Sequence, residues 1–417
     1  MTDSTDFGCS DFGMTRRSIL KTAGVATMAG VVTSMFGDVL TSTVYGAENG
    51  NVLVVLSLRG GADGLSMVVP HHEPAYYSAR PGTAVEKGEL LKADSYFGLH
   101  PKFAAMLPLW NAKKFAVINS VGLPAPNRSH FEAMEIVEDA DPGSSARVGW
   151  INRMVGGLAP ANDPFEALQL GTALTPTSMF GPAPTLAANN FTDLSLPWAD
   201  DPRMHGRLVK GLKLQYGKRT DTLGHAAMNA MKVSDRSNVF ATAAKKGPAN
   251  GATYPNGELA AALKNAAAAI KTGSGVKAVA VDFGSWDHHT GLNWNVANQI
   301  EQLSLNVAAF FTDLGAHADR VTLVTLSEFG RRLQENGAHG VDHGYGSAVL
   351  VAGAGLKNSG YYGTWPGLGI GKQVDGDLAV TTDYRNVIAE ILRRRFPAVN
   401  TSKVFPGVTY KPVGFMA

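Results

Sequence analysis

Carboxylate and imidazole side chains recur in this sequence at points where short apolar runs end. Several carboxylates that meet without matching lysines raise one another's pKa unless a cation lies among them. Carboxylate oxygen combined with imidazole nitrogen suits zinc or manganese better than calcium. We therefore expect one or two divalent metal ions, and the expected ligands are Asp63, Asp287, His289, Glu328, Asp342 and His343.

Three consecutive residues beside this set are candidates for catalysis. Ser129 is the expected nucleophile, Arg128 could hold an anionic ester with its planar guanidinium, and His130 completes the group. A paired-metal site would activate a nucleophile at one ion and stabilise the leaving oxygen at the other, as displacement at phosphorus or sulfur requires. Ser120 is the alternative nucleophile because it lies closer to its strand.

Each assignment has a structural alternative. Asp63 lies in a glycine-rich turn, where an aspartate often serves only turn formation. Ser129 could cap a helix that begins at His130, with a glutamate three residues later completing a capping box. Glu328 could form a structural salt bridge. Adjacent side chains usually diverge, so we expect only one of His288 and His289 to face the metal.

The apolar runs that precede these residues predict the strands of one sheet. Unbroken apolar runs are typical of strands buried on both faces of a parallel sheet. Helical patterns lie between the runs, including one with an apolar face over residues 300–314 and one capped by Asp383. This alternation predicts an α/β fold, a three-layer α/β/α sandwich with a largely parallel central sheet, in which ligands bind at the carboxyl ends of the strands. The five runs are residues 52–58, 115–118, 276–281, 321–326 and 348–352.

Composition places the chain among globular proteins and argues against nucleic acid as a partner. Its 417 residues are 45% hydrophobic and 17% charged, and the net charge is only +2. Such a balance provides no broad basic field for nucleic acid. Residues from about 156 to 257 are rich in Pro, Asn, Thr and Ala with weak periodicity, so we expect a loop-rich insertion there.

The N-terminus predicts export. Arg16 and Arg17 precede an uncharged run over residues 22–37, which is shorter than the roughly 20 apolar residues that a membrane span needs. This pattern indicates a twin-arginine signal peptide over residues 1–46, read by the twin-arginine translocase, and a mature domain over residues 47–417 in the periplasm. A short anchor helix is the alternative. Cys9 would be lost with the signal, which leaves no thiolate ligand and no disulfide.

An ordered series of motifs resembles a known family. The motifs are "LRGGADGL", "RSHFEAM", "GWINRM", "SWDHHTG", "SEFGRR" followed by Asn336, "DHGYGSAVLVAGAGL" and "DYRNVIAEIL". Together with the twin-arginine signal they resemble the exported domain-of-unknown-function family numbered fifteen-oh-one, which is grouped with sulfatases in the alkaline phosphatase superfamily.

The resemblance implies roles for individual residues. Asp63 matches the metal-binding aspartate after the first strand, and Ser129 lies where the nucleophile or its metal contact is expected. Asp287 with His289 resembles one ligand group, Asp342 with His343 resembles another, and Glu328 occupies the place of a common aspartate. His288 stands where the family more often has a threonine. Sulfatases of the formylglycine type carry a cysteine where "PAPNR" has proline, so that chemistry is not expected.

The sequence thus favours an exported metal-dependent hydrolase of phosphate or sulfate esters, acting on a small-molecule or glycan ester. The alternative is a non-catalytic protein of the same fold that binds an envelope glycan or a partner. A nicotinamide oxidoreductase is disfavoured, because the turn after the first strand lacks the Gly-x-Gly-x-x-Gly spacing.

Overall fold

The computed structural model describes residues 50–141, 143–158, 163–198 and 201–417. The expected signal peptide over residues 1–46 lies outside them. The chain forms two compact units, a helical unit over Leu194–Asn238 and a main unit from the described parts of Ser42–Asp193 and Val239–Ala417. Among the described residues, no helix combines the length and apolar character that a membrane crossing needs.

The main unit is built on a nine-stranded sheet with a largely parallel direction. β11 runs antiparallel to both of its neighbours, β4 and β8, and the other pairings are parallel. β15 (Thr382–Asp383) pairs with β4 beside this path. Across the sheet the order is β12 (Gly360–Tyr362), β4 (Phe115–Gly122), β11 (Ser347–Gly353), β8 (Val321–Leu326), β1 (Val52–Leu58), β7 (Ala278–Phe283), β5 (Ala167–Leu170) and β6 (Leu186–Ala188).

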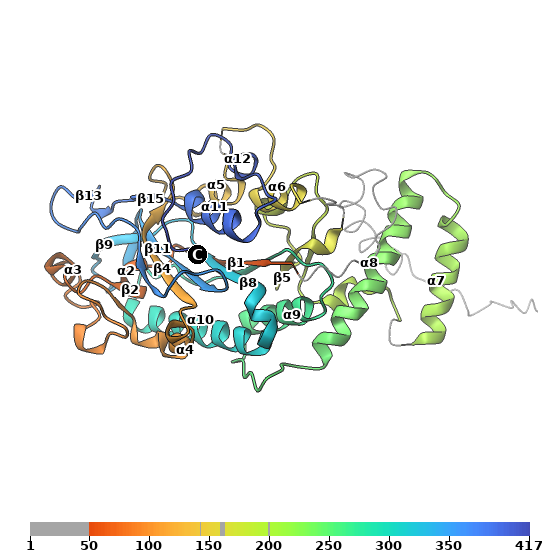
Figure 1. Ribbon diagram of the computed structural model, residues 1–417, viewed down its shortest axis with the longest axis horizontal. Helices are drawn as coiled ribbons and strands as arrows, with labels where there is room; N and C mark the ends of the chain where they lie inside the picture. Colours follow the sequence, from red (N-terminus) through yellow and green to blue (C-terminus); the bar gives the residue numbers. More distant parts are fainter. Residues whose placement is uncertain (1–49, 142, 159–162, 199–200) are drawn as a thin grey trace, which may run out of the picture. The chain divides into compact units, whose positions relative to one another are not determined.

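Helices cover both faces of this sheet (Figure 1). On one face the core joins strand side chains to α5 (His130–Asp139), α6 (Trp150–Gly156), α11 (Tyr384–Arg395) and α12 (Thr401–Val404). On the other face lie α4 (Leu107–Asn111), α9 (Glu258–Lys271) and α10 (Leu292–Leu314). The predicted three-layer α/β/α sandwich with a largely parallel central sheet is confirmed.

Two of the predicted runs become strands in which every side chain is buried. All seven residues of β1 and all six of β8 are buried, and their bounds coincide with the predicted runs. The apolar face expected over residues 300–314 is the buried face of α10. Asp383 caps α11 by accepting a hydrogen bond from the Arg385 N–H, as predicted.

Smaller elements surround the edge of the sheet where the strands β1, β7 and β8 end. A four-stranded sheet has the order β10 (Val341–His343), β9 (Arg331–Glu335), β14 (Asp377–Leu378) and β13 (Gln373–Val374). β2 (Val68–Val69) pairs with β3 (Gly98–Leu99), and the short helices are α2 (Gly64–Met67) and α3 (Pro74–Ala79). The 3₁₀ turns are not confined to this edge but occur along the chain, as η1 (Lys87–Glu89), η2 (Pro101–Met106), η3 (Pro164–Glu166), η4 (Thr177–Met179), η5 (Phe191–Leu194) and η6 (Gly315–Arg320).

The segment from 156 to 257 contains more regular structure than its composition indicates. β5 and β6 extend the central sheet, and two long helices follow, α7 (Pro202–Tyr216) and α8 (Thr222–Lys245). β5 is only four residues long, so its apolar run is too short to stand out. The loop-rich insertion that we expected here therefore also contains two strands of the central sheet and two long helices.

Candidate metal centre

Four strands deliver their following loops to one edge of the sheet. β1, β7 and β8 are mutually parallel, so their carboxyl ends lie together. β4 is antiparallel to β11, which is antiparallel to β8, and β4 therefore runs in the same direction as β8. His130 begins α5, the helix that follows β4, and Asp287 and Glu328 lie in the loops after β7 and β8. His343 ends β10 at the same edge.

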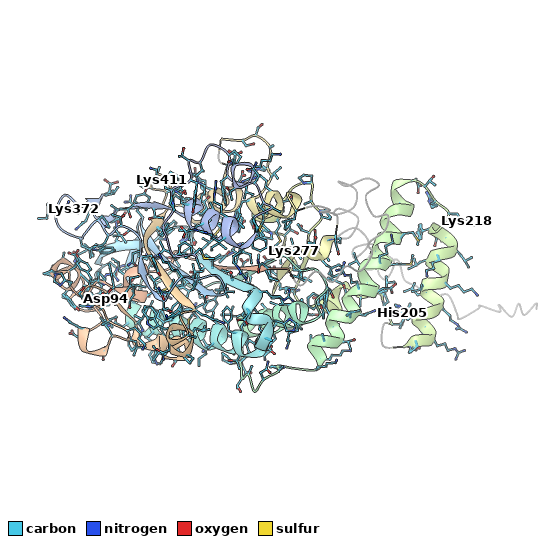
Figure 2. The ribbon with its side chains drawn as sticks, viewed as in Figure 1. Asp94, His205, Lys218, Lys277, Lys372 and Lys411 are labelled. Carbon is cyan, nitrogen blue, oxygen red and sulfur yellow. The ribbon has the colours of Figure 1, made fainter. Side chains whose placement is uncertain are left out.

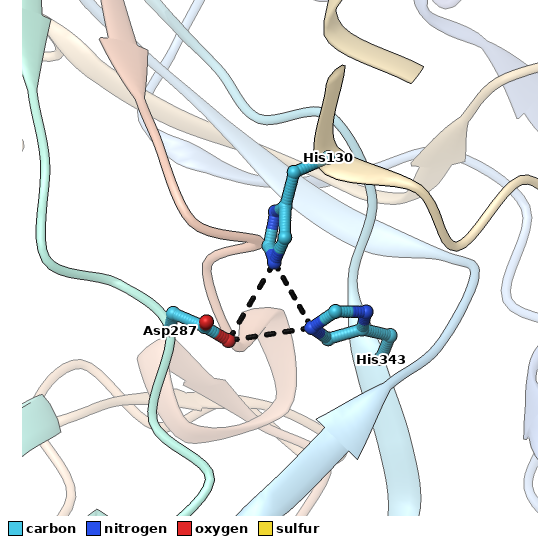
Figure 3. A group of neighbouring side chains, drawn as sticks. All are labelled: His130, Asp287 and His343. Carbon is cyan, nitrogen blue, oxygen red and sulfur yellow. Dashed lines mark hydrogen bonds and ion pairs between the residues drawn. The ribbon is translucent and has the colours of Figure 1, made fainter. Parts of the chain in front are cut away.

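Three imidazoles and one carboxylate converge at this edge. The Nε2 atoms of His130 and His289 each lie 2.9 Å from Nε2 of His343. Asp287 Oδ1 lies 3.6, 3.0 and 3.4 Å from Nε2 of His130, His289 and His343. Figure 3 shows the His130, Asp287 and His343 side chains pointing toward one another. These three residues form a group that could hold a metal ion, and His289 presents a fourth ligand atom to it.

The second nitrogen of each imidazole is bound to an acceptor. Nδ1 of His130 lies 2.8 Å from Glu328 Oε1, and Nδ1 of His289 lies 2.8 Å from Asp342 Oδ1. Nδ1 of His343 lies 2.9 Å from the carbonyl oxygen of Arg128. Carboxylates and carbonyls only accept, so each neutral ring carries its proton on Nδ1 and directs an Nε2 lone pair into the group.

Three lone pairs and a carboxylate oxygen that face one another repel unless a cation lies among them. Burial, the largest cause, lowers the pKa of His343, so this ring stays neutral at a lower pH than an ordinary histidine. Neutral imidazole is the form that binds metal, and an acceptor on the second nitrogen is the usual support for a metal-binding histidine. The donor set therefore fits a divalent metal ion.

Arg331 anchors the carboxylate of the group. Its side chain is 1% exposed, and its Nη2 donates to Asp287 Oδ1 at 2.6 Å. The same guanidinium donates to the backbone carbonyls of Gly60, Gly61 and Val341. Burial opposes ionisation of Asp287, but the hydrogen bond and charge of Arg331 outweigh it and hold the pKa of Asp287 below its usual range.

Glu328 and Asp342, which we expected as ligands, lie behind the imidazoles. Glu328 is 3% exposed and its Oε1 accepts from both the His130 ring and the Gly60 N–H, at 2.8 Å each. Asp342 accepts from His289 and from Asn336 Nδ2, and these hydrogen bonds lower its pKa. Both carboxylates orient a ring instead of pointing an oxygen into the group.

The structure does not bring Asp63 into the group. Asp63 is 1% exposed, and Arg80 binds both of its oxygens, at 2.5 and 3.0 Å. Ser66 Oγ donates to the same carboxylate. Burial opposes ionisation of Asp63, but the charge and hydrogen bonds of Arg80 win, so the pKa of Asp63 lies below its usual range. The positive charge that pairs with Asp63 is therefore that of Arg80.

The three expected catalytic residues have different surroundings. His130 is the first residue of α5 and belongs to the imidazole group. Ser129 is the N-cap residue of α5, but its exposed side chain makes no capping hydrogen bond, so the capping box is not formed. The Arg128 guanidinium is hydrogen-bonded to the fully buried Asp377 carboxylate.

The two open choices of residue are also distinguished by geometry. His289 faces the group, whereas the neighbouring His288 is 6% exposed and its ring lies beside Trp286. Ser120 is fully buried within β4 at a φ of 57°, and its hydroxyl has no hydrogen-bond partner. A hydroxyl buried in this way is poorly accessible to a substrate.

Sequence reasoning missed the roles of three polar residues, two that support the site and one that pairs with Asp63. Arg331 lies in the motif "SEFGRR", three residues after Glu328, but the motif alone assigns it no role. Asn336 entered only as part of a motif, yet its Nδ2 donates to Asp342 Oδ1 at 3.1 Å and to the His289 carbonyl at 3.0 Å. Arg80 gave no signal, because nothing in the local pattern links it to Asp63.

Some solved structures resemble the chain at low identity. The lipoteichoic acid synthase LtaP from Listeria monocytogenes is 11% identical, with a TM-score of 0.31, 80% of this chain covered and 73% of that chain. The C-terminal periplasmic domain of EptC from Escherichia coli in complex with Zn is 10% identical, with a TM-score of 0.33 and 74% of each chain covered. A second structure of that domain is 10% identical, with a TM-score of 0.37 and coverage of 88% of this chain and 89% of that chain.

No curated protein matches the chain. A family profile described as "Protein of unknown function (DUF1501)" matches residues 110–403, which is more than half of the sequence and includes His130, Asp287, His289 and His343. The chain belongs to this family of proteins of unknown function, DUF1501.

Proposed function

We propose that the protein is an exported metal-dependent hydrolase of phosphate or sulfate esters, with the α/β/α fold expected of the alkaline phosphatase superfamily. One observation carries the proposal. Three Nε2 lone pairs and the Asp287 oxygen converge at one point, while every Nδ1 is occupied by an acceptor. The metal ligands in this proposal are His130, Asp287, His289 and His343.

The donor set favours a single ion. Of the other expected ligands, Asp63 is paired with Arg80, and Glu328 and Asp342 hold imidazoles. Within the part of the chain that the structure describes, the only group suited to a metal is the one that contains His130, Asp287 and His343. Three imidazole nitrogens favour zinc over calcium, and manganese remains the second choice.

A divalent ion bound there would act as a Lewis acid toward the oxygen of an ester and lower the pKa of a hydroxyl near it. Ser129 is the proposed nucleophile, because its hydroxyl is exposed, free of a capping bond and adjacent in the chain to His130. Glu328 and Asp342 keep the rings of His130 and His289 oriented. Arg128 contributes its carbonyl to His343, and its guanidinium remains a candidate for contact with an anionic ester.

Export by the twin-arginine translocase belongs to this proposal. Residues 1–46 would be removed as a signal peptide, residues 47–417 would form the periplasmic domain, and the substrate would be a small-molecule or glycan ester. The open position of the ligands agrees with a substrate that arrives from solvent, because the side chains of Asp287 and His289 are 47% and 40% exposed.

The experiment combines metal analysis with an ester panel. Protein purified after native export is expected to hold about one zinc or manganese ion per chain and to cleave p-nitrophenyl phosphate, p-nitrophenyl sulfate or a phosphodiester. His343→Asn is expected to lose both the ion and the activity. His339→Asn is the matched control, because His339 is exposed on the neighbouring loop outside the group.

Two results would contradict the proposal. Wild-type protein that carries no ion after native export would refute the metal centre. Metal-loaded protein that cleaves no ester would instead support the non-catalytic alternative, a binding protein of the same fold, and then ligand binding should survive chelation.

A further inference from the structure

The helix α7 presents a basic side to solvent. Arg203, Arg207, Lys210 and Lys213 follow one another at intervals of four and three residues, so they lie on one side of the helix. All four side chains are exposed, and none is in an ion pair in the part of the chain that the structure describes. The helix contains no acidic residue. We call these four residues the basic face.

The opposite side of α7 is apolar and already partly covered. Met204, Leu208, Leu212 and Tyr216 recur every four residues, and each is half-buried. This division fixes which side of the helix meets solvent. The basic face is therefore free to contact another molecule, whereas the apolar side is already partly buried.

Large apolar side chains are exposed in the same helical unit. Leu214 lies between the cations of the basic face and is 77% exposed. Trp198, just before α7, is 48% exposed, and Leu223, just after the turn that follows α7, is 53% exposed. Figure 2 shows Lys218 at the end of α7, which adds a further exposed cation there.

We propose that the basic face of α7 docks on an anionic lipid bilayer. The cations would lie at the level of the lipid phosphates, and Leu214 would enter the boundary between headgroups and acyl chains. Charge alone would suit any polyanion, but an exposed leucine among the cations gains free energy only where an apolar phase is within reach. This partner lies beyond the proposed ester hydrolysis and does not depend on it.

Vesicle sedimentation of the mature protein tests the proposal. We expect binding to vesicles of phosphatidylcholine with about 30% phosphatidylglycerol in low salt, little binding to pure phosphatidylcholine, and release in 1 M NaCl, where the Debye length falls to about 3 Å. Replacing the basic face by glutamine at all four positions is expected to weaken binding about 100-fold or more. Leu214→Gln is expected to weaken it less, and to the same degree at every salt concentration.

A second quadruple variant controls for net charge. Lys87, Lys246, Lys372 and Lys411 are exposed in the main unit, and replacing them by glutamine removes the same charge; Lys372 and Lys411 are labelled in Figure 2. We expect this variant to bind like the wild type. Circular dichroism should show unchanged helix content in every variant.

Several outcomes would overturn the proposal. Equal binding to neutral and anionic vesicles would remove the role of charge, and equal loss in both quadruple variants would remove the role of α7. Wild-type protein that ignores both vesicles but binds heparin with steep salt dependence would assign the basic face to a soluble polyanion. An unaffected Leu214→Gln variant would exclude contact with the apolar phase.

Discussion

Arg331 donates to the same Asp287 oxygen that faces the three imidazoles, at a distance of 2.6 Å. The arginine is itself held by backbone carbonyls from two other segments of the chain. This carboxylate is therefore ionised and oriented whether or not a metal is bound.

Metal affinity is expected to fall as the pH falls through the range in which histidines take up protons. A proton on Nε2 competes directly with the ion, and an ordinary histidine has a pKa of about 6.5. Burial lowers the pKa of His343, so this ring keeps its Nε2 lone pair to a lower pH than an ordinary histidine does. Competition with a chromophoric chelator between pH 5 and 8 measures the effect. Affinity independent of pH across that range would argue against an imidazole ligand set.

Asn336→Ala is expected to weaken metal binding about 10- to 100-fold, the usual cost of losing a residue that supports a ligand. Asn336 holds the Asp342 carboxylate, which in turn holds His289. Chelator competition gives the affinity, and thermal unfolding of the metal-free protein tests the fold. Asn295→Ala is the control. Asn295, in α10, donates a similar hydrogen bond to the carbonyl of Thr290, the residue that follows His289. Equal losses in both variants would refute a specific role for Asn336.

Arg80→Met is expected to destabilise the protein by about 3–5 kcal/mol, because it leaves the buried Asp63 carboxylate without its partner. The double variant with Asp63→Asn should recover much of this loss, since no unpaired charge remains. Chemical denaturation of the three variants and the wild type completes the cycle. Asp63→Asn protein that folds should keep its full metal content, and loss of the ion there would restore Asp63 as a ligand.

The contribution of the Asp63–Arg80 pair to the stability of the protein is expected to depend on pH. The folded-state pKa of Asp63 is below its unfolded value, so its contribution to stability is complete above about pH 4 and is lost as the pH falls through the folded-state pKa. The difference in stability between the wild type and the double variant should therefore shrink only in acid. A difference that instead changes between pH 6 and 8 would point to another group.

Ser129→Ala is expected to lower ester cleavage by about 10³-fold or more while changing stability by less than about 0.5 kcal/mol. The small effect on stability follows because the hydroxyl makes no capping bond. Ser120→Gly removes the alternative hydroxyl at a positive φ that glycine adopts freely, and it should leave activity intact. Activity retained in Ser129→Ala but lost in Ser120→Gly would identify Ser120, and not Ser129, as the nucleophile.

Most of the sheet was predictable, because β1, β4, β7, β8 and β11 bury all or most of their side chains and so appear as apolar runs. β5 and β6 were not, since a strand of three or four residues cannot be told from loop by its pattern. The basic face of α7 could not be predicted from the near-neutral charge of the whole chain, because a net charge does not show where cations cluster.

The sequence predicted the location of the site better than it predicted the role of each residue. Asp287 and His289 follow β7 and His343 ends β10, and these positions bring them together. We expected Asp63 in the group, but His130 belongs to it and Asp63 does not. The sequence could not show this for Asp63, because Arg80, which pairs with it, lies 17 residues away with no pattern to link the two. Whether a carboxylate points at an ion or at an imidazole depends on side-chain packing, which spacing does not encode.

The reversed direction of β11 explains why one short stretch of chain contributes so much to this centre. A further parallel strand after β8 would have required a crossover to the opposite end of the sheet. Because β11 returns antiparallel beside β8, the connection from Ser327 to Gly346 never leaves the ligand-bearing end. Insertions or deletions in that hairpin-like connection should therefore alter the ion's surroundings, while the strands that flank it keep their register.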